Sequence, residues 1–196
     1  MQGQSELILA LRPVIAFLEN SKTRYFVGGS VASSYHGASR STLDVDLTVQ
    51  LSEAAIPELC LALSDQYYLN EQSIRSAIRR NSCFNLIHFE TSFKVDIFVS
   101  DASPYSEESQ KRAIIGEIGD NPTLPVRMAS VEDIIVIKLD WYRMGGEVSE
   151  RQWNDLLSVA RLNAKLLDVD YLRKWAHVKA VMPLLERLLK ETSASI

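Results

Sequence analysis

The sequence predicts an α+β fold, in which helices flank a mixed β-sheet and a C-terminal helical portion follows. Two stretches, 43–49 and 93–99, alternate hydrophobic and polar residues as half-buried strands do. The stretches between them carry apolar residues at the three-and-four spacing of amphipathic helices. From residue 130 onward the periodicity is helical throughout. We expect residues 1–129 to form a core and residues 130–196 to be a helical portion packed on it.

Composition narrows the class of protein further. Of the 196 residues, 46% are hydrophobic and 23% are charged, which excludes disordered, collagen-like and coiled-coil chains. No apolar run approaches the roughly 18 residues that span a bilayer, and the N-terminus lacks the features of a signal peptide. We therefore expect a cytoplasmic protein with no membrane partner. A net charge of −4 argues against a broad surface that tracks nucleic-acid phosphates.

Helices and short strands alternate through the first hundred residues. The pattern predicts a helix over 5–20, which Pro13 should kink or restart. Residues 25–27 form a buried strand that stops at a glycine pair, and Ser30 is the expected N-cap of a short helix that ends near Gly37. Further helices are expected at 52–64, with Ser52 as the cap, and at 71–79. Strands are expected at 43–49, 83–89 and 93–99, with a polar turn joining the last two as a hairpin.

The second hundred residues become helical. A helical turn near 105–112 and strands around 113–118 and 124–128 come first. Capping boxes that start at Ser130 and Ser149 then open two helices. Two more helices, at about 168–178 and 182–191, complete the chain. The tryptophans and the tyrosine of these helices are expected to pack inside the helical portion: Trp141, Tyr142, Trp153 and Trp175.

Two aspartates lie where they could share a cation. Asp44 and Asp46 are two residues apart on a predicted strand and project to one face, about 6.6 Å apart along the chain. Magnesium takes one or two carboxylates together with substrate phosphates. Asp96 lies on the polar face of the later hairpin and is the candidate third carboxylate, which would let two ions clamp the reacting oxygens.

The bend Gly28-Gly29-Ser30 is a candidate phosphate site. Glycines let the backbone approach a phosphate, and the start of the next helix offers N–H groups and a favourable dipole. Each feature alone has a commoner structural explanation, because a glycine pair is often only a turn and alternating aspartates often form a solvated face. Together and in this order, they predict a phosphate cradle beside a metal site.

These residues also carry a resemblance to a known superfamily. Gly29-Ser30, thirteen intervening residues and then Asp44-Val45-Asp46-Leu47 resemble the signature of nucleotidyltransferases related to DNA polymerase beta. The fuller string is similar to the minimal nucleotidyltransferases of the AbiEii toxin group and their uncharacterised relatives. It comprises Phe26–Ala32, Tyr35-His36-Gly37 and Arg40–Leu47, and in the helical half the stretches 130–139 and 149–155.

The resemblance implies a nucleotidyltransferase-like fold, a nucleoside triphosphate as substrate, and Mg²⁺ or Mn²⁺ as cofactor. It implies that Gly29 and Ser30 hold the triphosphate and that Asp44 and Asp46 bind the metal. Asp96 matches the superfamily's third carboxylate, which acts as general base toward the acceptor hydroxyl. In the helical half, Lys138 would contact phosphate, and Asp155 would position that lysine or the nucleotide.

The residues of the helical half give uneven support of their own. Lys138 lies in a helix that is apolar nearly all round, and burial of an unpaired ammonium is costly. A lysine with a buried stem and a charged end in water explains the same pattern equally well. Asp155 lies opposite the apolar stripe of its helix, so without the resemblance we would expect it to be exposed.

The remaining candidates have weaker signals. Arg40, in the loop before the acidic strand, could meet phosphate or an acceptor, or could neutralise Asp44. Arg75, Arg79 and Arg80 form a basic cluster that is either a solvated face or a guide for an RNA end. The histidines lack metal-ligand spacing, so structural or surface roles are expected for them. Cys60 and Cys83 have no CxxC spacing and are expected to be buried, reduced thiols.

Three functions follow, in decreasing order of support. The first is a metal-dependent nucleotidyltransferase that moves a nucleoside monophosphate to an acceptor hydroxyl, in the manner of a toxin that modifies RNA such as a tRNA 3′ end and is paired with a cognate antitoxin. The second is a nucleotide-binding or partner-binding module that retains the cradle without turnover. The third is a purely structural domain.

Overall fold

Contacts divide the chain into two compact units. The computed structural model describes residues 2–38, 42–119 and 123–193, with side chains from Glu6 onward. The sheet unit comprises Met1–Val31 and Ser41–Met128, and the helical unit comprises Ala32–Arg40 and Ala129–Ile196. None of the described helices is long and apolar enough to cross a membrane.

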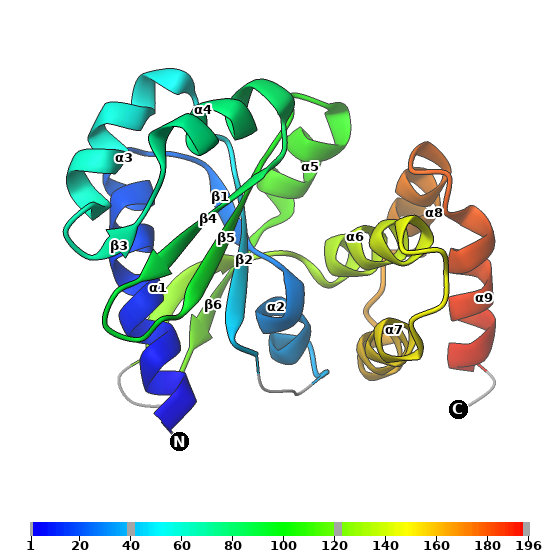
Figure 1. Cartoon of the computed structure of the whole chain (residues 1–196). Coiled ribbons are helices and arrows are strands. Elements are labelled where there is room, and N and C mark those ends of the chain that lie inside the picture. The colour runs from blue at the N-terminus through cyan, green and yellow to red at the C-terminus, as the bar shows by residue number, and fades with distance from the viewer. Residues whose placement is uncertain (1, 39–41, 120–122, 194–196) are drawn as a thin grey trace. The chain divides into compact units, whose positions relative to one another are not determined.

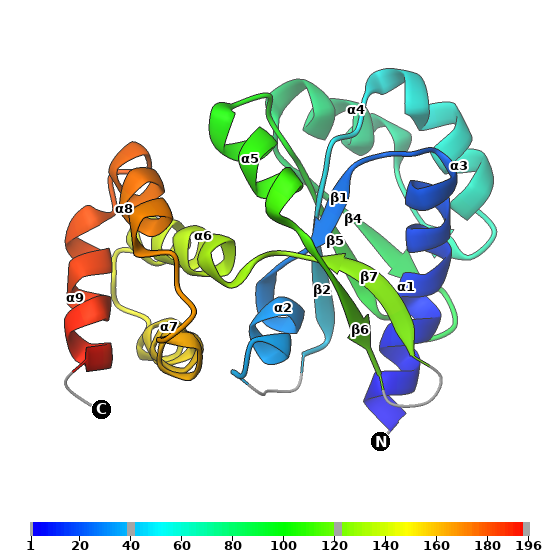
Figure 2. The same cartoon turned by 180° about the vertical axis from the view of Figure 1, so that it is seen from behind.

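A mixed sheet of seven strands forms the centre of the sheet unit, in the order β3-β4-β5-β2-β1-β7-β6 (Figures 1 and 2). The strands are β1 (Tyr25–Val27), β2 (Asp44–Val49), β3 (Tyr67–Tyr68), β4 (Cys83–His88), β5 (Lys94–Val99), β6 (Ile114–Ile118) and β7 (Leu124–Met128). β2 runs antiparallel to β1 and parallel to β5. β4 and β5 form the expected hairpin. The α+β class with a mixed sheet is thus confirmed.

The central strands are half-buried. Val45, Leu47 and Val49 of β2 are buried, and the residues between them are partly exposed. β4 and β5 alternate in the same way, because successive side chains of a strand point to opposite faces of the sheet. The apolar face packs under α1 (Gln2–Asn20), α3 (Ile56–Leu63) and α4 (Glu71–Arg80). The other face is polar along β2 and β5.

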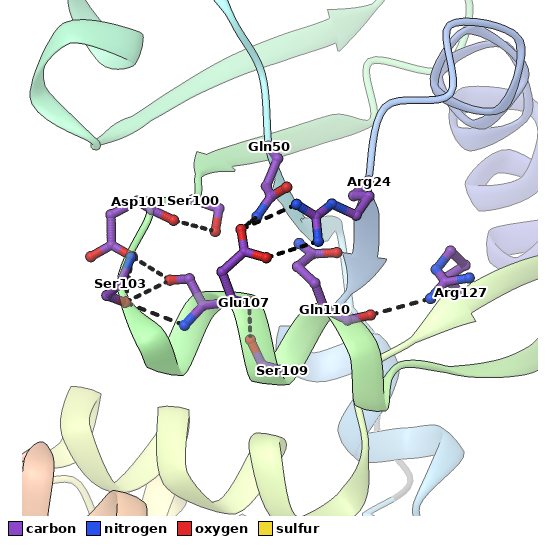
Figure 3. A network of polar contacts seen from close by, with 10 residues as sticks. Arg24, Gln50, Ser100, Asp101, Ser103, Glu107, Ser109, Gln110 and Arg127 are labelled. Carbon is purple, nitrogen blue, oxygen red and sulfur yellow. Dashed lines mark hydrogen bonds and ion pairs between the residues drawn. The ribbon is translucent and has the colours of Figure 1, made fainter.

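A polar network ties α5 (Pro104–Arg112) to the sheet (Figure 3). Glu107 accepts hydrogen bonds from Arg24, at 3.0 and 3.1 Å, and from Gln50, at 2.9 Å. Gln110 of α5 donates to the carbonyl of Thr48 in β2. These contacts hold α5 near the end of β2 that carries Val49, away from the aspartates of that strand.

Between residues 129 and 193, the helical unit contains four helices: α6 (Val131–Met144), α7 (Glu150–Asn163), α8 (Val169–Val178) and α9 (Met182–Ser193). Ser130 and Ser149 cap α6 and α7 as expected, because their hydroxyl oxygens accept hydrogen bonds from the amides three residues on. Tyr142, Trp153 and Trp175 are buried in this unit and Trp141 is partly exposed.

Several local expectations were wrong. Ser30 is not an N-cap, because α2 (Gly29–Tyr35) begins one residue earlier. Ser52 makes no side-chain capping bond, and a short 3-10 helix, η1 (Glu53–Ala55), precedes α3. Of the two alternatives for Pro13, the restart does not occur, because Pro13 lies inside one helix. Neither thiol is fully buried, since Cys60 is partly exposed and Cys83 is exposed.

Candidate functional site

The glycine bend touches Asp46 directly. β1 and β2 are antiparallel, so the end of β1 meets the start of β2, and the Gly28 amide donates to the Asp46 carbonyl at 2.8 Å. Gly29 has φ of +54°, and a Cβ at this position would lie 1.6 Å from Oδ2 of Asp46. The Asp46 carboxylate therefore fills the space that any side chain at residue 29 would need. Only glycine combines this backbone conformation with this contact.

The three candidate carboxylates project from one face of two neighbouring strands. β2 and β5 are parallel and in register, which places Asp46 beside Asp96 and Asp44 beside Lys94. Since alternate residues of a strand share a face, all four side chains lie on the polar face of the sheet. The sequence predicted that the aspartates lie on the polar faces of their strands. The pairing of β2 with β5 makes those faces one continuous polar face.

Lys94 lies between two of the carboxylates. Its Nζ is 2.6 Å from Oδ2 of Asp96 and 3.9 Å from Oδ2 of Asp44. The Asp96 side chain is only 14% exposed, whereas those of Asp44 and Lys94 are 42% and 41% exposed. Sequence reasoning did not include Lys94 among the site residues, although alternation had placed it on the same face as Asp96.

Electrostatics of the polar face follow from this arrangement. The hydrogen bond to Asp96 raises the pKa of Lys94, and the negative charges of the aspartates add to the effect. On β4, partial burial of the Cys83 thiol, with Asp96 and Asp46 nearby, raises the pKa of Cys83 to about 11. The thiol is therefore protonated at neutral pH, which makes it a poor metal ligand. The site offers hard oxygen donors.

These donors suit magnesium bound together with phosphate. No group of three or more His, Cys, Asp or Glu side chains in the described part of the chain is arranged to hold a metal ion by itself. Magnesium does not require such a cage, because it binds through one or two carboxylates plus substrate phosphates. Asp44 and Asp46 supply two carboxylates beside the glycine bend. Thr42 orients Asp44, since its hydroxyl donates to Oδ1 at 2.8 Å.

In the helical unit, Lys138 and Asp155 form an ion pair. Nζ of Lys138 on α6 lies 3.3 Å from Oδ2 of Asp155 on α7, and the two side chains are 10% and 17% exposed. The expectation from the helical wheel that Asp155 is exposed was therefore wrong. That wheel describes one helix alone, and the packing of α6 on α7 covers this side of α7.

We expect Asp155→Asn to lower the free energy of unfolding by about 1–3 kcal/mol, because a mostly buried ammonium loses its charged partner. Urea denaturation measures the effect. Glu186→Gln is the matched control in the same unit, since the pair of Glu186 with Arg173 is about half exposed and should contribute less than about 1 kcal/mol. Equal losses in the free energy of unfolding for the two variants would show that burial of the Lys138–Asp155 ion pair does not increase its contribution to stability.

The other candidates have local partners or lie outside the description. Arg40 is outside the described residues. Arg75 of the basic cluster pairs with Glu71 and Glu53. Nε2 of His36 donates a hydrogen bond to the carbonyl of Ala129 at 2.8 Å, and burial lowers the pKa of His36.

The comparisons with known proteins concern the fold. No protein-family model matches the sequence, and no curated protein matches it. The crystal structure of an antigenic nucleotidyltransferase-like protein from Paracoccidioides brasiliensis is similar, with a TM-score of 0.54 and 15% identity, over 95% of this chain and 93% of that one. The solution structure of the antibiotic-resistance factor ANT(2'')-Ia is also similar, with a TM-score of 0.52 and 14% identity, over 94% and 97% of the two chains.

A third solved structure, of the lincosamide antibiotic adenylyltransferase LnuA with lincomycin bound, matches with a TM-score of 0.45 and 13% identity, over 81% of this chain and 96% of that one. The first two structures show that the chain has a nucleotidyltransferase-like fold. At these identities they show the fold alone.

Proposed function

We propose that the protein is a metal-dependent nucleotidyltransferase, which transfers a nucleoside monophosphate from a nucleoside triphosphate to an acceptor hydroxyl. The observation that carries this proposal is the contact between Gly29 and the Asp46 carboxylate, with Asp44 and Asp96 on the same sheet face. The bend that is proposed to hold phosphate and the two carboxylates that are proposed to hold magnesium thus lie side by side.

In the proposed reaction the acceptor oxygen bonds to the α-phosphorus, and the bond from that phosphorus to the bridging oxygen breaks, so pyrophosphate leaves. Asp44 and Asp46 would hold Mg²⁺ or Mn²⁺, which supplies positive charge to the phosphates. Gly28, Gly29 and Ser30 would hold the triphosphate. Fixing the reacting groups in line provides much of the rate enhancement.

The remaining site residues keep the roles that the sequence resemblance implies. Asp96 would accept the proton of the acceptor hydroxyl on Oδ1, because Oδ2 is paired with Lys94. Lys138, held by Asp155, and Arg40 are the proposed additional phosphate contacts. Each of these roles is a proposal that single substitutions can test.

For the acceptor, we favour a small hydroxyl-bearing molecule over RNA. RNA is bound largely through its phosphates by lysine and arginine, whereas a small molecule needs few charged contacts. Several described arginines already pair with acids: Arg24 with Glu107, Arg75 with Glu71, Arg143 with Asp140, Arg173 with Glu186 and Arg187 with Glu191. The net charge of −4 agrees with this choice. A tRNA 3′ end, as in a toxin with a cognate antitoxin, is the competing acceptor.

The test is transfer of label from each of the four α-labelled nucleoside triphosphates in the presence of Mg²⁺. One arm offers hydroxyl-bearing antibiotics and other small alcohols, and the second offers total tRNA. We expect a labelled small product and pyrophosphate, both dependent on Asp46. Label in tRNA instead would reverse the acceptor assignment, and toxicity on expression that Asp44→Ala relieves would support the toxin model. Nucleotide binding without any product would favour the non-catalytic module.

A further inference from the structure

Lys94 is the positively charged residue that shares one face of strands β2 and β5 with Asp44, Asp46 and Asp96. It is the first residue of β5 and lies in register with Asp44. Its ammonium is 2.6 Å from an oxygen of Asp96, a hydrogen-bonded ion pair, and 3.9 Å from an oxygen of Asp44. A fixed positive charge therefore already lies between carboxylates from two strands.

Stability explains one of the two contacts of Lys94. The Asp96 side chain is 14% exposed, so the ammonium of Lys94 supplies the counter-charge of a mostly buried carboxylate. Lys94 and Asp44 are each about two-fifths exposed, and an ion pair at such exposure contributes little to stability. The register of β2 with β5 is held by main-chain pairing along six residue pairs, from Asp44 with Lys94 to Val49 with Val99. The ion pair of Lys94 with Asp44 is therefore not needed to set the register of these two strands.

The positive charge of Lys94 bears on how many metal ions the three carboxylates of this face can bind. Three carboxylates on one face repel each other, and a third carboxylate beside Asp44 and Asp46 is what would let the site hold two divalent ions. Pairing Asp96 with an ammonium removes it from the set of available ligands. Asp44 and Asp46 remain, which is the number of carboxylates that one magnesium ion takes when phosphates complete its shell.

We propose that the ammonium of Lys94 takes the place of a second divalent cation, so that this site binds a single divalent ion through Asp44 and Asp46. The proposal rests on the function proposed above, because it assumes that these two aspartates bind metal. Asp96 then stays paired with Lys94 when the metal is bound. Lys94 acts as a positioning residue for Asp96 and sets the number of ions.

The test is Mn²⁺ binding to the protein with a non-hydrolysable nucleoside triphosphate present, because phosphates complete the shell of the ion. Electron paramagnetic resonance of the unbound ion follows the binding, with the nucleotide alone as the blank. We expect Lys94→Gln to bind one more Mn²⁺ per chain than the wild type, or to bind the ion at least about tenfold more tightly, because a positive charge within about 4 Å of the ligands is lost. Lys94→Arg, which keeps the charge, should behave as the wild type. Circular dichroism of each variant verifies folding.

Two further variants assign the effect to its cause. Lys111→Gln removes the same charge from α5, where Lys111 is exposed, and should leave Mn²⁺ binding unchanged. The double variant Lys94→Gln/Asp96→Asn should lose the gain, because the released carboxylate is removed as well. If the double variant still bound more Mn²⁺ than the wild type, Asp96 would not be the carboxylate that pairing with Lys94 keeps from the metal. That result would overturn the proposal.

The outcomes separate this inference from the function on which it rests. Equal Mn²⁺ binding by the wild type and Lys94→Gln, lost in Asp46→Asn, would overturn the role of Lys94 and leave the metal site standing. Two ions bound to the wild type would do the same. Absence of Mn²⁺ binding beyond that of the nucleotide alone, in the wild type and in every variant, would overturn both the single-ion proposal and the metal dependence of the proposed function.

Discussion

Asp46→Asn is expected to lower kcat/KM for nucleotide transfer by about a thousandfold, the upper range for removing one electrostatic contact to the transition state. The substitution keeps the shape of the side chain, so the contact with Gly29 and the hydrogen bond from the Gly28 amide to the main chain are retained. What changes is the charge that the metal ion and its phosphates require. Release of pyrophosphate and transfer of label give two independent measures of the rate.

The control for this prediction is Asp65→Asn, which removes the same charge from an exposed position beyond α3. It should leave transfer unchanged and exclude a general effect of net charge. Thermal melting should show that both variants remain folded. Transfer by Asp46→Asn at the wild-type rate would contradict the assignment of Asp46 as a metal ligand and remove the main support for the proposed mechanism.

Gly29→Ala is expected to have the largest effect on stability, a loss of about 2–5 kcal/mol in the free energy of unfolding. The new Cβ would lie 1.6 Å from Oδ2, 2.5 Å from Cγ and 2.9 Å from Cβ of Asp46, so rotation of the carboxylate alone cannot relieve the clash. The positive φ adds conformational strain. Because Asp46 must move, transfer activity should fall together with stability. Urea denaturation and the transfer assay measure the two effects.

Alanine substitutions at two other glycines separate the effect of backbone strain from the effect of the steric clash with Asp46. Gly146→Ala meets the same conformational strain, at φ of +75°, but has nothing within 4 Å, so we expect a loss of about 1 kcal/mol. Gly28→Ala meets only the carbonyl of Asp46 at 3.9 Å, an ordinary contact, and should cost less. If Gly29→Ala were no more destabilising than Gly146→Ala, the close contact between Asp46 and the bend would be disproved.

Local pattern was sufficient for most of the secondary structure. The strand at 25–27 was predicted with its observed bounds. The hairpin of β4 and β5 was predicted with its observed outer ends and with each inner end one residue too long. Alternation of side chains and capping serines are properties of neighbouring residues, so they are visible in the sequence itself. The short strand β3 was missed, because two tyrosines are too few to show any period.

Errors arose where a residue's surroundings come from a distant part of the chain. Leu43 continues the apolar alternation of the acidic strand, yet it lies outside β2 and is 85% exposed, because the strand pairing begins only at Asp44. Asp155 looked exposed on its own helix and is covered by α6. In both cases the sequence does have the periodicity described. Periodicity, however, contains no information about which other element packs beside a given strand or helix.

The amino-acid order by itself determined the polar faces of the strands, the glycine bend, the helix starts at Ser130 and Ser149 and the ordered set of acidic and basic candidates. Only the tertiary structure decided which of them meet: β2 lies between β1 and β5, which sets Asp46 against Gly29 and beside Asp96, and brings Lys94 between Asp44 and Asp96. The physical reason is that periodicity reports on neighbours along the chain. Strand order and the contacts between elements come instead from burying apolar surface across long sequence separations.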